Sequence, residues 1–125
     1  MSGPIRNYHD LEVWKKARIL VKIIYKLTSL FPREELYGLT SQLRRAAVSI
    51  PSNIAEGHSR SGTKDYIQFV SMAIGSLAEV ETQVLLALDL GFCHADDIAD
   101  IIEQICVLQR MLHALRNSLK SKLKP

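Results

Sequence analysis

The residues in this sequence that best suit a chemical task are its lysines and arginines, and the task is holding phosphate. The chain has 125 residues, with 16 Lys and Arg against 13 Asp and Glu, and a net charge of +3. Seven basic residues form two groups, the first along one face of the first helical stretch and the second around the next stretch and the loop after it: Lys15, Lys22 and Lys26, then Arg44, Arg45, Arg60 and Lys64. Phosphate binding needs several positive charges that act together. So small a net charge permits a nucleic-acid partner without requiring one, and each residue is also typical of a solvated helix face.

Residues that would serve catalysis or metal binding do not occur at useful spacings. The histidines lie on separate segments, and no Glu has a His three residues later, the spacing found in di-iron bundle sites. The sequence contains no HExxH, no GxSxG and no Gly-rich phosphate loop. Cys106 lies among apolar helix residues, where an inert thiol is expected, and Cys93, beside His94 in a turn, is the one candidate for a reactive or small-molecule site. We therefore expect no enzyme, no metal and no cofactor.

Four stretches with helical periodicity must position the basic residues. Apolar residues recur at alternating three- and four-residue steps through four segments: about 10–30, 36–57, 63–90 and 96–119. The connections are short, so we predict an all-α fold, an antiparallel up-down-up-down four-helix bundle in one domain over 1–125. Residues 1–9 are expected to form a loose N-terminal arm, and 120–125 a basic C-terminal tail.

The first helical stretch is apolar over a wider face than one bundle seam requires. A second apolar row containing Trp14, Val21 and Tyr25 lies beside the row that should face the core. These three residues are expected in the core or in the interface of a homo-oligomer. A closed symmetric ring would repeat each basic patch around its axis and so extend a modest charge into a larger surface.

Three residues in the middle helices are expected to have structural roles. Pro51 interrupts the apolar seam of the second helix, where the missing N–H and the crowded carbonyl of Ala47 predict a kink. Asn53 lies at the edge of the buried face and needs hydrogen-bond partners. Alternatively, the helix stops and restarts at Pro51, with Ser and Asn side chains as caps. Gly75, beside Ser76, is small enough to allow a close helix crossing.

The sequence has no feature that directs it to a membrane or out of the cell. Its first ten residues contain no apolar stretch of the kind found in signal peptides, and the longest uncharged apolar run spans only 84–88. The two cysteines form no CxxC pair, so reduced thiols are expected. A cytoplasmic protein without a membrane partner is the resulting expectation.

The run Q-L-R-R-A-A-V-S-I-P-S-N-I-A-E-G-H-S-R at 42–60 resembles the signature of the four-helix-bundle family associated with intervening sequences in bacterial 23S ribosomal RNA. Further matches are D-L-E-V-W-K-K-A at 10–17 and G-S-L-A-E-V-E-T-Q at 75–83. Many members carry an Arg where this chain has Ile74, so any contact made by that Arg is absent here. The resemblance implies an up-down bundle and a ring of subunits, as a pentamer. The family is also similar to the accessory proteins of diversity-generating retroelements, which are basic rings that work with a reverse transcriptase and RNA. No catalytic residue carries over.

Two functions fit these observations. The first is a non-enzymatic, oligomeric protein that binds structured RNA or other nucleic acid through phosphate contacts. The second is a scaffold or accessory subunit that recruits another protein and does not touch nucleic acid. A protein partner that is retained after nuclease treatment would favour the scaffold, and salt-dependent binding to nucleic acid would favour the first.

Overall fold

Four long helices and two short 3-10 turns make up the computed structural model, which describes residues 7–123. No strand occurs in that part of the chain, so the all-α prediction is confirmed. The elements follow one another in this order: η1 (Tyr8–Asp10), α1 (Glu12–Thr28), η2 (Arg33–Glu35), α2 (Leu39–His58), α3 (Thr63–Asp89) and α4 (Ala95–Ser121).

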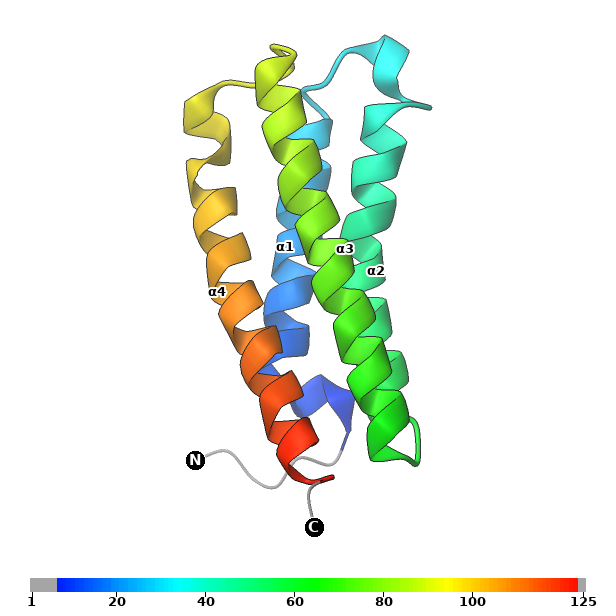
Figure 1. Ribbon diagram of the computed structural model, residues 1–125. Helices are drawn as coiled ribbons and strands as arrows, with labels where there is room; N and C mark the ends of the chain where they lie inside the picture. Colours follow the sequence, from blue (N-terminus) through cyan, green and yellow to red (C-terminus); the bar gives the residue numbers. More distant parts are fainter. Residues whose placement is uncertain (1–6, 124–125) are drawn as a thin grey trace.

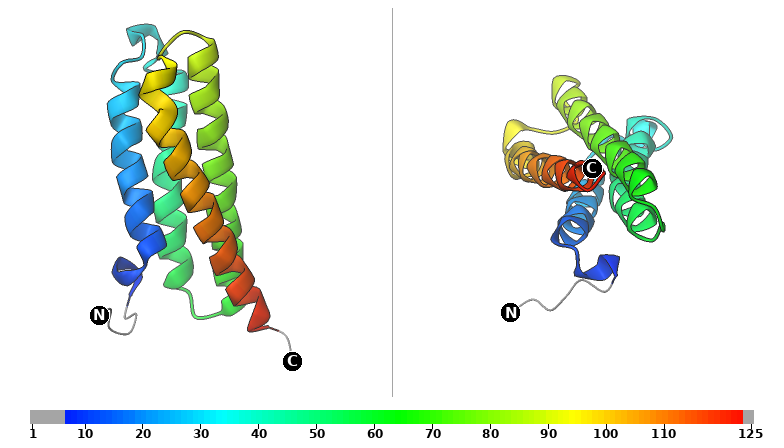
Figure 2. Two further views of the ribbon diagram at one scale, coloured as in Figure 1. Left: turned by 90° about the vertical axis from the view of Figure 1, so that its left-hand side faces the viewer. Right: turned by 60° about the horizontal axis from the view of Figure 1, so that its bottom comes forward.

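The helices form a bundle in which the chain reverses direction at each connection (Figure 1). Each helix packs against the next one in the sequence, and α4 closes the bundle by packing against α1. Diagonal helices make no close backbone contact within the described residues. The contact between α2 and α3 is the most extensive, and that between α1 and α4, which is tilted relative to α1, is the least extensive (Figures 1 and 2).

One hydrophobic core runs the length of the bundle and is built from the predicted seams. The α1 row of Val13, Ala17, Leu20, Ile24 and Leu27 is buried, and it continues into buried Phe31 after the helix. The seams of α3 and α4 are buried in the same way, except for half-buried residues near one end of each. Each fully buried Leu or Ile contributes roughly 1.5–3 kcal/mol relative to exposure. Burial along four stripes therefore fixes which face of every helix points outward.

Helix α2 passes through Pro51 without a break, so the continuous helix is confirmed and the restart is wrong. A bend at Pro51 stays a prediction. Pro51 and Asn53 are both half-buried, at the edge of the core stripe. The Asn53 Nδ2 atom donates to the Ser49 carbonyl at 2.8 Å and to Ser49 Oγ at 2.9 Å. Ser49 Oγ lies 2.7 Å from Ser76 Oγ, so a polar contact ties α2 to α3 halfway along the bundle.

The close crossing of α2 and α3 occurs at Gly57. The prediction that Gly75 allows this crossing is wrong. Gly75 is exposed, and a methyl group at that position would meet no atom within 4 Å. Gly57 is buried, and a Cβ there would lie 2.7 Å from Phe69 Cβ and 3.0 Å from the Tyr66 ring. No real Cβ tolerates such a contact, so only glycine lets the two helices come this close.

Both ends of the chain are more ordered over the described residues than the predicted arm and tail. The side chain of Asn7 caps η1 by accepting the His9 N–H at 2.8 Å. Tyr8 packs edge-on against Trp14, with ring centroids 5.2 Å apart. Residues 7–9 are therefore not loose, because they close one end of the bundle. Residues 1–6 and 124–125 lie outside the described part, and α4 extends to Ser121, into the predicted tail.

Helix α3 has the length and mean hydropathy of a membrane span, although no single apolar run in it is long. Seven of its residues, spaced as a bundle seam from Val70 to Ala87, are buried against the other helices. A core helix of a soluble bundle passes the same test, so this property is weak evidence for a membrane. Gly91, at φ +77°, follows the C-cap residue Leu90 and ends the helix in the left-handed conformation that favours glycine.

Candidate nucleic-acid interface

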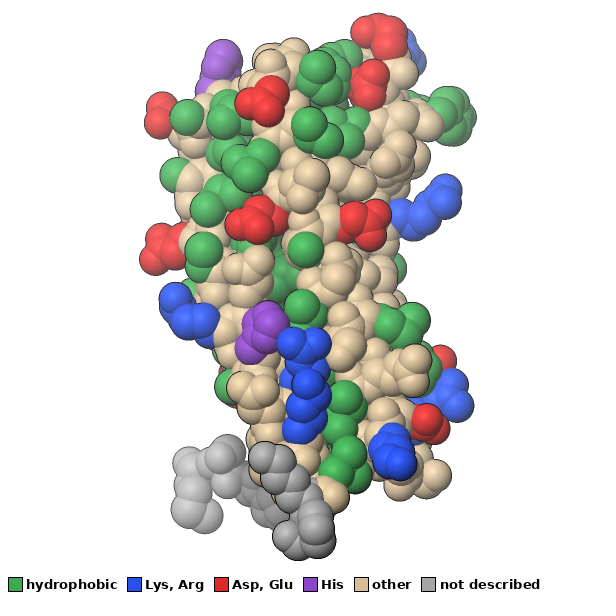
Figure 3. Space-filling model, viewed as in Figure 1, with side chains coloured by type: hydrophobic (Ala, Val, Ile, Leu, Met, Phe, Trp, Pro, Cys, Tyr) green, Lys and Arg blue, Asp and Glu red, His purple; other side chains and the backbone are tan. Residues whose placement is uncertain are grey.

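Charge is divided between the two halves of the bundle. We call residues 7–20, 49–76 and 108–123 the basic half, and residues 21–48 and 77–107 the acidic half; each helix is cut at its middle. The basic half holds nine Lys and Arg against four Asp and Glu, and the acidic half holds five against nine. On the face formed by α3 and α4, acidic side chains lie mostly in the upper part and basic ones mostly in the lower part (Figure 3). The described residues of the two halves therefore carry net charges of opposite sign.

Three of the seven predicted basic residues lie in the basic half, on three different segments. Lys15 is exposed on α1 and has an ion pair to Glu12 at 3.3 Å. Arg60 stacks over the Phe69 ring at 5.0 Å and lies 3.8 Å from Glu56. Lys64, in the first turn of α3, is exposed and has no partner among the described residues. Both ion pairs are solvent-exposed, so each holds its cation only weakly and leaves it available to phosphate.

The other four predicted residues do not form one cluster with these three. Lys22 and Lys26 are exposed on α1, the first close to the boundary between the halves and the second beyond it. Arg44 is half-buried and tied to the end of α1: its Nε donates to Thr28 Oγ1 at 2.7 Å, and its guanidinium lies 4.6 Å from the centre of the Tyr25 ring. Arg45 is exposed and unpaired in the described part of the chain. Arg44 therefore has partners within its own chain, whether or not it also contacts phosphate. The predicted grouping of Arg44 and Arg45 with Arg60 and Lys64 is wrong, because the two pairs lie near opposite ends of α2.

Six basic residues that were not predicted to bind phosphate also lie in the basic half, and two of them come from the predicted basic tail. They lie in the basic half of α1 (Lys16 and Arg18), in the second half of α4 (Arg110, Arg116 and Lys120) and directly after that helix (Lys122). Arg116 is partly fixed, because one terminal nitrogen donates to Ser71 Oγ at 3.1 Å and the other lies 3.2 Å from His113 Nδ1. A signal was present in the sequence: α4 begins with three aspartates and ends with lysines. That order also suits the helix dipole, which makes it easy to read as helix stabilisation alone.

The predicted interface residues of α1 are only partly available. The Trp14 ring is half-buried and contacts Tyr8, His9 and the guanidinium of Arg18. Val21 is half-buried against the core. Tyr25 is 43% exposed, although Arg44 covers one face of its ring.

The thiol candidate at the acidic end does not have the environment of a reactive cysteine. Cys93 is buried, and burial together with the nearby Asp97 carboxylate raises the pKa of its thiol. A raised pKa disfavours the thiolate, which is the nucleophilic form. Among residues 7–123, no three His, Cys, Asp or Glu side chains gather as metal ligands would.

Comparison with known protein families matches residues 9–114 to the family described as "23S rRNA-intervening sequence protein". The match runs from η1 to the last third of α4 and so includes all four helices, the Gly57 crossing and most of the basic half. A comparison with curated proteins gave no significant match. Because the matched region covers most of the chain, the protein belongs to the 23S rRNA-intervening sequence protein family.

Proposed function

We propose that this protein is a non-enzymatic, homo-oligomeric, cytoplasmic protein that binds RNA through the basic half of its bundle. The supporting observation is the concentration of nine Lys and Arg at the end where α1 begins, α2 meets α3 and α4 ends. Exposed lysines on three segments reach phosphates without reading base edges. Structured RNA suits such a surface, because its shape and phosphates are recognised more readily than its paired bases.

Assembly would multiply this charge. In a cyclic ring whose bundles run parallel to the rotation axis, every basic half lies on the same face. Five copies, the number implied by the family resemblance, would present a continuous ring of cations. A single subunit has a net charge of only +3, so the ring makes binding at physiological salt possible.

The salt dependence of RNA affinity tests this proposal. Affinity for a structured RNA should fall steeply with salt, and the double variant Lys64→Glu with Lys120→Glu should bind more weakly with a shallower slope. Each lost phosphate contact removes about 0.7–0.9 from the slope of log affinity against log salt. The matched control is Lys26→Glu with Arg33→Glu, the same change of charge in the acidic half, which should retain most of the affinity. A flat salt response of the unaltered protein, or equal losses in both variants, would contradict the proposal.

A second candidate function is a scaffold that recruits a protein partner. The observation in its favour is the set of large apolar side chains exposed around the acidic end, which includes Leu30, Tyr37 and Leu90. Tyr37 is 93% exposed, which is unusual for so large a ring unless another molecule covers it. A specific partner that stays bound after complete nuclease digestion, with no RNA affinity in the purified protein, would favour this function over the first.

A further inference from the structure

Three aromatic side chains gather where α1 begins, in the basic half. The centre of the Trp14 ring lies 5.2 Å from that of Tyr8 and 5.1 Å from that of His9, both in edge-to-face orientation. The ring centres of Tyr8 and His9 are 4.4 Å apart. Tyr8 and Trp14 are half-buried and pack against the core, whereas His9 is exposed. Tyr8 and Trp14 therefore cover the end of the core, and His9 extends the aromatic surface toward solvent.

Two cations lie beside these rings. Arg18, one turn after Trp14, places its guanidinium over the Trp14 ring at 4.9 Å from the ring centre. Lys15, one turn before Arg18, is exposed as Arg18 is. His9, Trp14, Lys15 and Arg18 line an open hollow of about 660 Å³, which we call the Trp14 hollow. A volume of that order is typical of small-molecule sites, and this hollow joins flat rings to positive charge.

The Trp14 hollow is built on a backbone that is held by hydrogen bonds. Asn7 Oδ1 accepts the His9 N–H at 2.8 Å, and the Leu11 N–H donates to the Tyr8 carbonyl at 3.0 Å. Leu11 is buried and anchors the connection between η1 and α1. His9 is therefore positioned relative to Trp14 before a ligand arrives, which lowers the entropic cost of binding.

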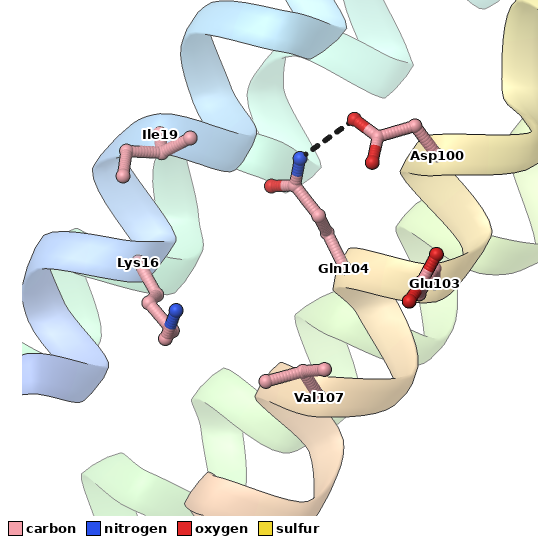
Figure 4. Close-up of a pocket in the computed structure, with 6 residues that line it drawn as sticks. All are labelled: Lys16, Ile19, Asp100, Glu103, Gln104 and Val107. Carbon is pink, nitrogen blue, oxygen red and sulfur yellow. Dashed lines mark hydrogen bonds between the residues drawn. The ribbon is translucent and has the colours of Figure 1, made fainter.

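A second cavity beside α1 has the opposite character. Lys16 and Ile19 of α1 face Asp100 and Glu103 of α4 across a groove of about 330 Å³ (Figure 4). None of the six residues that line this groove is aromatic, and the two carboxylates on its α4 wall repel phosphate. Of these two cavities, the Trp14 hollow is the one that suits a flat ring with a phosphate attached.

We infer that the Trp14 hollow binds a single nucleotide, with its base stacked on the ring surface and its phosphate held by Lys15 and Arg18. Every base has a flat π face, and aromatic rings and guanidinium planes bind it by stacking. The ion pair of Lys15 with Glu12, at 3.3 Å, is solvent-exposed and weak, so a phosphate can replace the carboxylate. The inference deepens the proposed function and rests on it, since an unpaired nucleotide of a structured RNA would occupy the hollow while other lysines hold the paired part.

The fluorescence of Trp14 tests this inference, because Trp14 is the only tryptophan in the chain. The probes are a short RNA duplex with unpaired adenosines at one end and the same RNA with abasic residues there, which keeps the phosphates and removes the bases. The first RNA should quench the fluorescence and bind about fivefold or more tightly than the second, as expected for one stacked base. Adenosine monophosphate at millimolar concentration should quench Trp14 as well, and adenosine without phosphate should quench it less.

A pair of aromatic variants locates the effect. His9→Ala removes the exposed ring of the hollow and should remove most of the preference for unpaired bases, while circular dichroism shows unchanged helix content. Tyr37→Ala is the matched control, because Tyr37 is a 93% exposed ring in the acidic half. It should keep both the quenching and the preference. Equal losses in the two variants would overturn the inference.

The same measurements separate the nucleotide site from the proposed function. Fluorescence that neither RNA nor adenosine monophosphate quenches would overturn the inference. Salt-dependent binding of both RNAs with equal affinity would also overturn it and leave the proposed function standing. Quenching by adenosine monophosphate without affinity for either RNA would support the site and overturn the proposed function, because the occupant would then be a free nucleotide.

Discussion

In the basic half, α2 and α3 meet with the backbone of Gly57 against Phe69, and the surface around that crossing carries lysines and arginines on several segments. In the acidic half, Tyr37, Leu30 and Leu90 lie exposed near the connections. An open groove between α1 and α4 crosses the boundary between the halves, because Lys16 and Ile19 of the basic half line it together with Asp100 and Glu103 of the acidic half. The first region is closed within one chain and presents charge to the outside. The second leaves large apolar side chains exposed. The proposed RNA contact and the exposed apolar side chains therefore lie at different ends of the bundle, so mutations can alter each of them separately.

The largest effect on stability is expected at the crossing in the basic half. Gly57→Leu places a side chain where a Cβ alone would lie 2.7 Å from Phe69 Cβ. Forcing the helices apart should cost about 3 kcal/mol or more of unfolding free energy. Urea denaturation followed by circular dichroism measures the loss. Gly75→Ala is the control in the same pair of helices, and it should stabilise the protein by up to about 1 kcal/mol, because that site is open and alanine favours helix. Equal behaviour of the two variants would show that the crossing is not where we place it.

A smaller loss of stability is expected when Arg44 is replaced. This variant tests whether Arg44 stabilises the fold or binds RNA. Arg44→Met removes the hydrogen bond to Thr28 and the stacking over Tyr25. We expect a loss of about 1–2 kcal/mol in unfolding free energy, as for a half-buried charged hydrogen bond. RNA affinity per assembled particle should remain unchanged. A strong loss of affinity at constant stability and mass would show that Arg44 contacts phosphate after all.

The smallest of these stability effects concerns the polar contact at the boundary between the halves. Asn53→Leu removes two hydrogen bonds to Ser49, with an expected cost of about 1 kcal/mol each at most, partly offset by the added apolar burial. Thermal unfolding and native mass should show altered stability or assembly, and RNA affinity should be intact. An ordered ligand found on the Asn53 amide, or a selective loss of RNA binding, would assign this residue to function instead.

Much of the fold was predictable from the sequence, because helical periodicity depends only on local spacing. The stripes from Val13 to Leu27 and from Ile98 to Leu119 are buried almost as the spacing predicts. The sequence also predicted that the Asn53 amide has hydrogen-bond partners, because an amide at the edge of a core needs them, but it did not predict that Ser49 is the partner. Periodicity indicates which face of a helix is buried, however, and not how high one residue lies relative to residues of another helix.

The errors follow from that limit. Lys15, Lys64 and Lys120 are far apart in the sequence, and only the folded topology shows that they share one end of the bundle. Arg44 and Arg45 are adjacent in sequence and look equivalent, yet Thr28, sixteen residues earlier, immobilises only the first. Gly57 had the right position in the apolar seam to be the close crossing. Gly75 was preferred because it has a small neighbour, although its side of the helix faces solvent.

The most direct test of the division between the two halves is protection of lysines from acetylation when a structured RNA is bound. Mass spectrometry of the assembled protein, with and without RNA, reports every lysine separately. We predict that Lys15, Lys64 and Lys120 become protected, whereas Lys26 in the acidic half is modified equally in both samples. Protection of Lys26 instead of the other three, or no protection at any lysine, would contradict this account.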